Sequence, residues 1–146
     1  MPKILNISPL AKKLGLNVGD EVVEIGGYPC QDILDVLYFD NEKKFDVVVN
    51  RDGKLKKIKV HKKEGQSLGI EFEEMEVIRC KNKCVFCFVD QLPKGLRDTL
   101  YVKDDDYRLS FISGCYVTMT NVTEAEIERI IRLKLSPLYI SVHAFN

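Results

Sequence analysis

Short runs of alternating apolar and polar residues fill the first half of the chain and predict antiparallel strands separated by turns. Residues 21–25 alternate through Val23 and Ile25, and Gly26-Gly27 then makes a tight turn in which positive φ costs nothing. Two further runs flank Asp52-Gly53, a dipeptide typical of a hairpin turn. We therefore expect strands at residues 21–25, 45–50 and 55–61, with the lysines of the last strand on a solvated face.

Two short helical patterns accompany these strands. Ser8 can cap a helix that has Pro9 at its first position, and Gly15 then stops the helix. Residues 32–39 place apolar side chains at helical spacing behind Asp32, an acidic N-cap. The first half of the chain is therefore expected to form a small, mainly β domain that carries two helices.

The second half of the chain predicts three strands, a loop and one helix. The strands are expected at residues 75–78, 113–121 and 137–143. A loop runs through Pro93-Lys94-Gly95, and the acidic run at residues 104–106 is interpreted as a solvated turn rather than a cation site. Thr123 can cap an amphipathic helix whose apolar residues are expected to face the sheet: Ile127, Ile130 and Ile131.

Composition narrows the class of protein. The chain has 146 residues, 45% of them hydrophobic and 30% charged, which suits one globular domain or two small ones. Its formal net charge is zero, so the simplest argument for nucleic-acid binding is absent. No run of about 18 apolar residues predicts a membrane span, and the start lacks the pattern of a secretory signal. Unpaired cysteines then indicate a reducing compartment, so we expect a cytoplasmic protein without membrane or nucleic-acid partners.

The candidate chemistry lies in one short segment. Cys80, Cys84 and Cys87 follow C-x3-C-x2-C spacing, with Phe86 just before the last cysteine. Three thiolates on one loop can each hold one iron of a cubane cluster and leave the fourth iron open to a small molecule. A zinc site would need a further ligand, such as Cys30 or Cys115. The odd number of cysteines argues against a disulfide framework, while inert thiols stay an alternative.

This spacing resembles the signature of the radical S-adenosylmethionine (radical SAM) superfamily, C-x3-C-x-aromatic-C. The resemblance implies a [4Fe-4S] cluster on Cys80, Cys84 and Cys87, with S-adenosylmethionine (SAM) bound at the open iron. It also implies that Phe86 lies near the adenine. The glycine- and glutamate-containing element that often contacts the SAM amine in these proteins is not present here.

Other residues of the expected second and third strands take cofactor roles only by this resemblance. Gly114, Thr118 and Asn121 are the substitutes for the missing SAM-contacting element. His143 comes at the expected catalytic end of the third strand, where a SAM or substrate contact is one reading and a structural histidine the other. Cys115 is expected to be a buried small hydrophobe, not a fourth ligand.

The first 73 residues resemble a bacterial PDZ domain. The pattern A-x-x-x-G-L-x-x-G-D-x-x-x-x-I-N-G-x-P is matched by Ala11, Gly15, Leu16, Gly19, Asp20, Ile25, Gly27 and Pro29, with Gly26 in place of the asparagine. The run Ser67, Leu68, Gly69 and Ile70 is similar to the loop that holds a peptide carboxylate in such domains. The resemblance implies a groove for a peptide C-terminus or for the family's own C-terminal region. A strand-edge turn is the alternative.

Residues 80–121 resemble most specifically a bacterial family whose members join a PDZ-like module, a radical SAM core and a C-terminal domain labelled DUF512. The resemblance implies an α/β protein: a PDZ-like domain over residues 1–73, then the first βα units of a partial TIM-type barrel over residues 74–146. Because family members continue further, we expect either a truncated form that is inactive alone or a chain that self-associates to cover its open barrel edge. The substrate is not implied. The alternative function is a non-enzymatic peptide-binding module whose cysteine segment binds zinc or is disordered.

Overall fold

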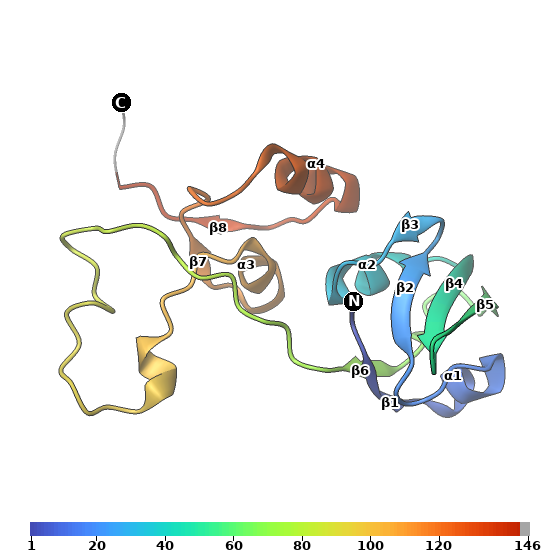
Figure 1. Cartoon of the computed structure of the whole chain (residues 1–146). Helices are drawn as coiled ribbons and strands as arrows, with labels where there is room; N and C mark the ends of the chain where they lie inside the picture. The colour runs from blue at the N-terminus through green and yellow to red at the C-terminus, as the bar shows by residue number, and fades with distance from the viewer. Residues whose placement is uncertain (144–146) are drawn as a thin grey trace. The chain divides into compact units, whose positions relative to one another are not determined.

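A computed structural model describes residues 1–143 of the chain. The chain divides into two compact units, Met1–Met75 and Glu76–Asn146, which are described separately (Figure 1). Across the described residues, no helix has both the length and the apolar character needed to cross a membrane. A domain boundary at residue 73/74 stays a prediction.

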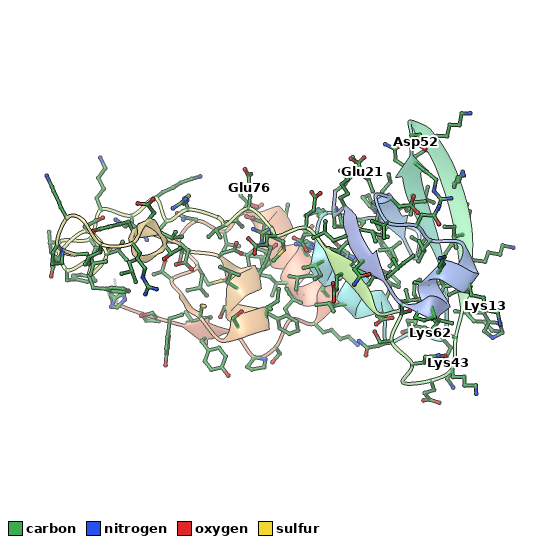
Figure 2. All side chains as sticks on the ribbon, turned by 90° about the horizontal axis from the view of Figure 1, so that it is seen from below. Lys13, Glu21, Lys43, Asp52, Lys62 and Glu76 are labelled. Atoms are coloured by element: carbon green, nitrogen blue, oxygen red, sulfur yellow. The ribbon has the colours of Figure 1, made fainter. Side chains whose placement is uncertain are left out.

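The first unit contains a four-stranded antiparallel sheet in the order β3-β2-β4-β5. Its strands are β2 (Glu21–Ile25), β3 (Tyr28–Pro29), β4 (Lys44–Arg51) and β5 (Lys54–His61). The predicted hairpin is confirmed: Asp52 and Gly53 both have positive φ, and Asp52 lies at the tip between β4 and β5 (Figure 2). This turn geometry matches the twist of paired strands, which fixes their register.

Simple alternation along β2 is wrong in one respect. The register between β2 and β4 shifts between Val22 and Glu24. Val22 and Ile25 are buried, whereas Val23 is half-buried. A β-bulge adds one residue to a strand and so turns the side chains beyond it to the other face.

Both predicted helices of the first unit are confirmed. Helix α1 (Pro9–Leu14) is capped by the Ser8 hydroxyl and ends at Gly15 in the left-handed conformation. Helix α2 (Ile33–Phe39) begins with a capping box. The Asp32 carboxylate accepts the backbone N–H of Asp35, and the Asp35 carboxylate accepts the backbone N–H of Asp32. A two-stranded antiparallel pair, β1 (Ile4–Ile7) and β6 (Ile70–Phe72), joins the start and the end of the unit.

The core of the first unit is a single cluster of buried apolar side chains. It combines residues of β1, of the four-stranded sheet, of both helices and of the loops between them: Ile4, Ala11, Leu16, Val22, Ile25, Cys30, Val36, Phe45, Val47, Val49, Val60 and Leu68. Gly26 is required where the turn after β2 meets Phe39, since a Cβ there would lie 2.1 Å from the ring. The alternating apolar side chains of β4 and β5 thus face one core, whereas the residues between them face away from it.

A buried ion pair closes this unit between the start of β2 and the end of β4. The Arg51 guanidinium donates to both carboxylate oxygens of Asp20, at 2.6 and 2.7 Å. Burial alone would raise the pKa of Asp20, but the hydrogen bonds from Arg51 and from the backbone N–H of Asn17 hold that pKa below its usual value. Asp20 is thus a charged group inside the fold whose ionised form is stabilised.

The second unit is mixed α/β. Its elements are a 3-10 helix η1 (Asp98–Tyr101), α3 (Tyr107–Ser113), β7 (Tyr116–Val117), α4 (Glu124–Leu133) and β8 (Tyr139–Ile140). Strands β7 and β8 pair in parallel through Tyr116↔Tyr139 and Val117↔Ile140. Parallel neighbours need a crossover connection, which α4 supplies here.

Two predicted strands of the second unit are wrong or too long. Residues 75–78 form no strand, and a single antiparallel bridge joins Arg79 to Asp104 instead. In place of a strand over 113–121, α3 ends at Ser113 and β7 covers only two residues before Met119 takes a positive φ. The predicted third strand is confirmed only at Tyr139–Ile140, within the expected 137–143.

Helix α4 and its Thr123–Glu126 capping box are confirmed, but the predicted buried face is wrong. Ile127 and Ile131 are exposed, and the buried side chains are Arg129 and Leu133. The Arg129 guanidinium donates to the hydroxyl of buried Tyr107, at 2.9 Å. A buried hydrogen bond from α4 to α3 therefore sets the face of the helix, not the isoleucine pattern.

The described residues contain a four-stranded sheet and two two-stranded sheets, and they form no closed barrel. The mixed α/β class is confirmed.

The ion pair of Asp20 predicts acid sensitivity of the first unit. Because the folded-state pKa lies below the unfolded value of about 3.9, the stabilisation is complete above that pH and is lost as pH falls through the folded pKa. Urea unfolding followed by circular dichroism should give a midpoint that falls steeply below about pH 4. The Asp20→Asn variant should be less stable at neutral pH and show a flatter acid dependence. An equally steep dependence in this variant would contradict the assignment.

Candidate functional site

A cavity of about 690 Å³ in the second unit gathers the cysteine segment. Its walls come from three stretches of chain, residues 80–89, 103–105 and 115–118, and from the segment after β8. The lining residues include the three cysteines of the motif together with Phe86, Asp105 and Thr118. Residues that are far apart in the sequence therefore meet around the predicted cysteine motif.

The backbone sets the shape of the cysteine segment. The Cys80 N–H donates to the Lys103 carbonyl at 2.9 Å, and the Asp105 N–H donates to the Ile78 carbonyl at 3.0 Å. The Cys87 N–H closes a turn onto the Cys84 carbonyl at 3.1 Å. These bonds bring the two ends of a long loop together and leave the cysteines on its inner side, along the cavity.

All three cysteines of the motif are free and half-buried. Among residues 1–143, no three His, Cys, Asp or Glu side chains are grouped closely enough to hold a single metal ion. A tetrahedral zinc site needs its ligands within about 2.3 Å of one point. The thiolates of an iron–sulfur cluster bind separate irons, so they surround a larger body. Three thiols are the ligand type that an iron–sulfur cluster requires, and these three line one cavity.

Asp105 is the most deeply buried carboxylate of this cavity, at 2% exposure. Its Oδ1 accepts the Thr118 N–H at 2.5 Å, and its Oδ2 accepts the Thr118 hydroxyl at 2.9 Å. The Asn82 amide donates to the Thr120 hydroxyl at 2.6 Å, and that hydroxyl lies 2.9 Å from the Thr118 hydroxyl. One hydrogen-bond network thus joins Asp105 to a residue between Cys80 and Cys84.

The neighbouring Asp106 has a different role. Its carboxylate caps α3 at the Arg108 N–H and pairs with the Arg108 guanidinium, at 2.7 Å. Burial alone would raise the pKa of Asp106, but the hydrogen bonds from Arg108 and from the Ile78 N–H lower it. The interpretation of residues 104–106 as a solvated turn is wrong, since Asp105 and Asp106 are buried. The signal available in the sequence was the N-cap position before Tyr107.

An aromatic pair lies at another wall of the cavity. The rings of Phe86 and His143 have centroids 5.0 Å apart, and the His143 Nε2 lies 2.8 Å from the Ser141 hydroxyl. Both Phe86 and Phe88 line the cavity and remain exposed. Phe86, predicted near the adenine, is therefore available to a flat ligand group.

The other predicted contacts are placed as follows. Thr118 lines the cavity, whereas Gly114 ends α3 and Asn121 donates to the Arg79 carbonyl; neither belongs to the lining residues. Cys115 lines the cavity and is exposed, so its prediction as a buried hydrophobe is wrong. The roles of Asp105, Asn82 and Lys103 were missed. Lys103 pairs with Asp90 at 2.6 Å, and its hydrogen bond holds the pKa of Asp90 below its usual value.

The family model for a Radical SAM-like domain matches residues 62–146 of the chain. This match covers more than half of the sequence. The chain belongs to the radical SAM-like domain family. No curated protein matches it.

The Ser67–Ile70 loop of the first unit, which resembles a carboxylate-binding loop, lies within the matched residues 62–146. In this loop the Leu68 N–H donates to Asp40 Oδ1 at 2.9 Å and the Ser67 hydroxyl donates to Asp40 Oδ2 at 2.6 Å. The Gly69 N–H donates to the Ser67 hydroxyl, and Ile70 begins β6. An internal carboxylate therefore already occupies donors of the loop that the sequence predicted to bind a peptide carboxylate.

Lys62 holds Asp40 in this position. The Lys62 side chain is only 1% exposed, and its ammonium donates to the carbonyls of Asp40 and Gln66, both at 2.6 Å. The same ammonium lies 3.5 Å from Asp40 Oδ1. Because a buried ammonium must be paired, the loop and Asp40 are stabilised together.

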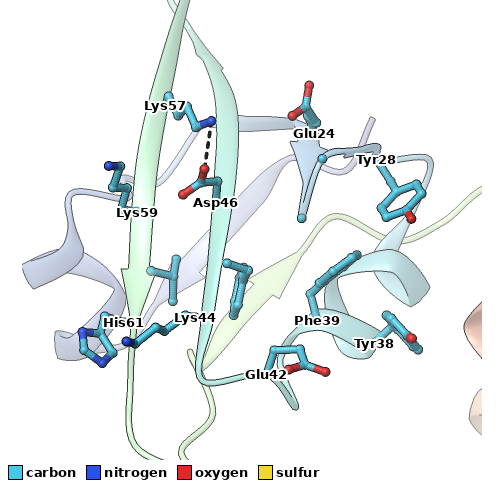
Figure 3. Close-up of a pocket in the computed structure, with 14 residues that line it drawn as sticks. Glu24, Tyr28, Tyr38, Phe39, Glu42, Lys44, Asp46, Lys57, Lys59 and His61 are labelled. Carbon is cyan, nitrogen blue, oxygen red and sulfur yellow. Dashed lines mark ion pairs between the residues drawn. The ribbon is translucent and has the colours of Figure 1, made fainter.

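A second cavity, of about 830 Å³, lies in the first unit beside β4 and β5 (Figure 3). The rings of Tyr28 and Phe39 stand at one side of it, with centroids 6.2 Å apart. Lysines of the strands stand at the other side, where Lys57 pairs with Asp46 (Figure 3). Acidic and basic side chains both line this cavity, so its charge favours neither anionic nor cationic ligands.

The Asp40–Lys62 contact predicts a large stability effect. Asp40→Ala should destabilise the first unit by about 2–4 kcal/mol, because it leaves the Lys62 ammonium short of its anionic partner. The matched control is Asp46→Ala, which breaks an exposed pair with Lys57 and should leave the urea midpoint nearly unchanged. Equal midpoints for the two variants would contradict the role of Asp40.

Proposed function

We propose that the protein is the N-terminal part of a radical SAM enzyme that holds a [4Fe-4S] cluster on Cys80, Cys84 and Cys87 and binds SAM beside it. The observation that carries this proposal is that three free thiols of one loop line a single cavity. The radical SAM-like family match supports it. Because such a cluster needs reduced thiols, the cytoplasm is the proposed location.

When bound, the cluster supplies one electron for reductive cleavage of the SAM sulfonium. The residues of this chain would bind the cluster and shield it from water. Cys80, Cys84 and Cys87 are the thiolate ligands, and the exposed rings of Phe86 and Phe88 exclude water when a ligand covers them. Thr118 offers a hydroxyl at the cavity wall. Gly114 and Asn121 are proposed to act by shaping the segments around β7.

The fold supports two finer proposals. The parallel β7–α4–β8 unit is the kind of unit from which a partial TIM-type barrel is built. The first unit is proposed to be PDZ-like, on the strength of its antiparallel sheet, its capped helix α2 and the pairing of β6 with β1. The resemblance to proteins with a DUF512 domain covers nearly the whole chain and is most specific in residues 80–121.

Cysteine substitutions test the cluster directly. After anaerobic reconstitution, the wild-type chain should hold about four irons and four sulfides. Changing Cys80, Cys84 or Cys87 to serine should remove most of both, because each change removes one ligand. The matched control is Cys115→Ser, which removes a thiol of the same cavity outside the motif and should keep the wild-type content.

Two results would contradict this proposal. One bound zinc with no iron would favour the non-enzymatic alternative, although the described residues offer no grouped set of ligands for a single ion. Loss of iron in Cys115→Ser equal to that in Cys80→Ser would assign four protein ligands to the cluster and leave no iron open to SAM.

Peptide binding by the first unit is the second candidate function. It is favoured by two groups of the Ser67–Ile70 loop, the Ser67 hydroxyl and the Leu68 N–H, that already donate to a carboxylate, although that carboxylate is Asp40. A peptide C-terminus, or the family's own C-terminal region, must therefore displace Asp40.

Fluorescence anisotropy with C-terminal peptides tests this condition. Asp40→Ser should bind them more tightly than the wild-type chain, and blocking the peptide carboxylate as an amide should abolish binding. Equal binding of amidated peptides would contradict carboxylate recognition. Self-association through the open sheet edge stays a prediction that light scattering checks.

A further inference from the structure

The last two cysteines of the motif are held by a local turn. The Cys87 N–H donates to the Cys84 carbonyl at 3.1 Å, and the Gln91 N–H donates to the Cys87 carbonyl at 3.2 Å. The side-chain amide of Gln91 also donates to the Val85 carbonyl, at 3.2 Å. These bonds lie within residues 84–91, so they fix Cys84 relative to Cys87 and leave the place of Cys80 to other contacts.

The residues on either side of Cys80 are bound by side chains from a distant part of the sequence. The carbonyl of Arg79 accepts the side-chain amide of Asn121, at 3.2 Å. On the other side of the cysteine, the Asn82 amide donates to the Thr120 hydroxyl at 2.6 Å. Both partners belong to the loop after β7, residues 118–123. This loop therefore helps to set where the first cysteine of the motif lies.

Asp105 anchors the loop after β7. Its carboxylate is buried, and it accepts the Thr118 N–H at 2.5 Å and the Thr118 hydroxyl at 2.9 Å. Its own N–H donates to the Ile78 carbonyl at 3.0 Å, two residues before Cys80. One buried residue thus binds both the loop after β7 and the start of the cysteine segment.

The carboxylate also fixes the direction of the hydrogen bonds between Asp105 and Asn82. An ionised carboxylate only accepts, so the Thr118 hydroxyl donates its proton to Asp105 and its oxygen is left to accept. The Thr120 hydroxyl, 2.9 Å away, is then the donor to Thr118, and its own oxygen accepts the Asn82 amide. Every donor in this series meets an acceptor, and hydrogen bonds ordered in this way strengthen one another.

We propose that Asp105 is a positioning residue for Cys80. Through its hydrogen bonds to the loop after β7, it fixes the place of Cys80 relative to the turn of Cys84 and Cys87, and thereby the spacing of the three thiols around one cluster. This inference rests on the proposed function. Partners that orient the ligands of a metal centre commonly change its affinity for metal by about 10- to 100-fold.

Alkylation of the chain without a cluster measures this positioning directly. Brief exposure to iodoacetamide under reducing conditions, followed by mass spectrometry, gives a rate for each cysteine. Thr118→Val removes the hydroxyl and keeps the side-chain shape, and Asp105→Asn puts an N–H where only acceptors stood. Each variant should raise the rate at Cys80 about fivefold, the ratio expected for the loss of one ordinary hydrogen bond. The rates at Cys84 and Cys87 should stay unchanged, because their turn is held locally.

Two further variants separate positioning from general loosening of the fold. Thr118→Ser keeps the hydroxyl and should restore the wild-type rate at Cys80. Thr99→Val is the matched control, because Thr99 is exposed on η1 in the same long segment and lies outside the hydrogen bonds described here. It should keep all three wild-type rates. A general loosening of the segment would instead raise the rates at all three cysteines together.

Release of iron to a chelator then tests the link to the cluster. After anaerobic reconstitution, Thr118→Val and Asp105→Asn should lose iron about fivefold faster than the wild-type chain, for the same reason as in alkylation. Thr118→Ser and Thr99→Val should lose it at the wild-type rate.

The inference and the proposed function fail in different ways. Unchanged alkylation at Cys80 in Thr118→Val and Asp105→Asn, or an equal rise at all three cysteines, would overturn the inference and leave the proposed function standing. Faster alkylation at Cys80 with unchanged release of iron would also overturn the inference. A wild-type chain that takes up no iron would overturn the proposed function, and with it the inference, whatever the alkylation rates.

Discussion

Two backbone hydrogen bonds hold the cysteine segment closed at its base. They run from the Cys80 N–H to the Lys103 carbonyl and from the Asp105 N–H to the Ile78 carbonyl, and together they form the antiparallel bridge between Arg79 and Asp104. Closing a loop of this length costs entropy that increases only slowly with its length, so a few bonds at the base are effective. The same closure places Cys80 beside residues 103–105, and hence beside the carboxylate of Asp105.

The rest of this segment has little core of its own. Val85 is 93% exposed and Phe88 is 78% exposed, and the helical content between residues 80 and 105 is the four-residue η1. Exposed apolar side chains at a cavity rim usually mark a surface that something covers. The order of the segment therefore comes from its closed base and from side-chain bonds such as Lys103–Asp90. A bound cofactor would add the burial that the loop lacks by itself.

The sequence predicted local features well where a single residue type determines the backbone. Ser8, Asp32 and Thr123 cap their helices as expected, and Asp52-Gly53 makes the predicted hairpin turn. It failed where the outcome depends on contacts distant in sequence. The β-bulge in β2 arises from pairing with β4, and α4 buries Arg129 because Tyr107 of α3 accepts its hydrogen bond. Periodicity cannot report such partners.

The candidate site shows the same division between local and distant information. Spacing alone was enough to single out Cys80, Cys84 and Cys87, because all three lie within one turn-forming segment. Asp105 was hidden in an acidic run that reads as solvated, and only the fold shows it buried against Thr118. The adjacent residues Asp105 and Asp106 thus differ in role because their hydrogen-bond partners differ. Arg108 gives Asp106 a structural role, whereas Asp105 accepts the backbone N–H and the hydroxyl of Thr118 at the wall of the cavity.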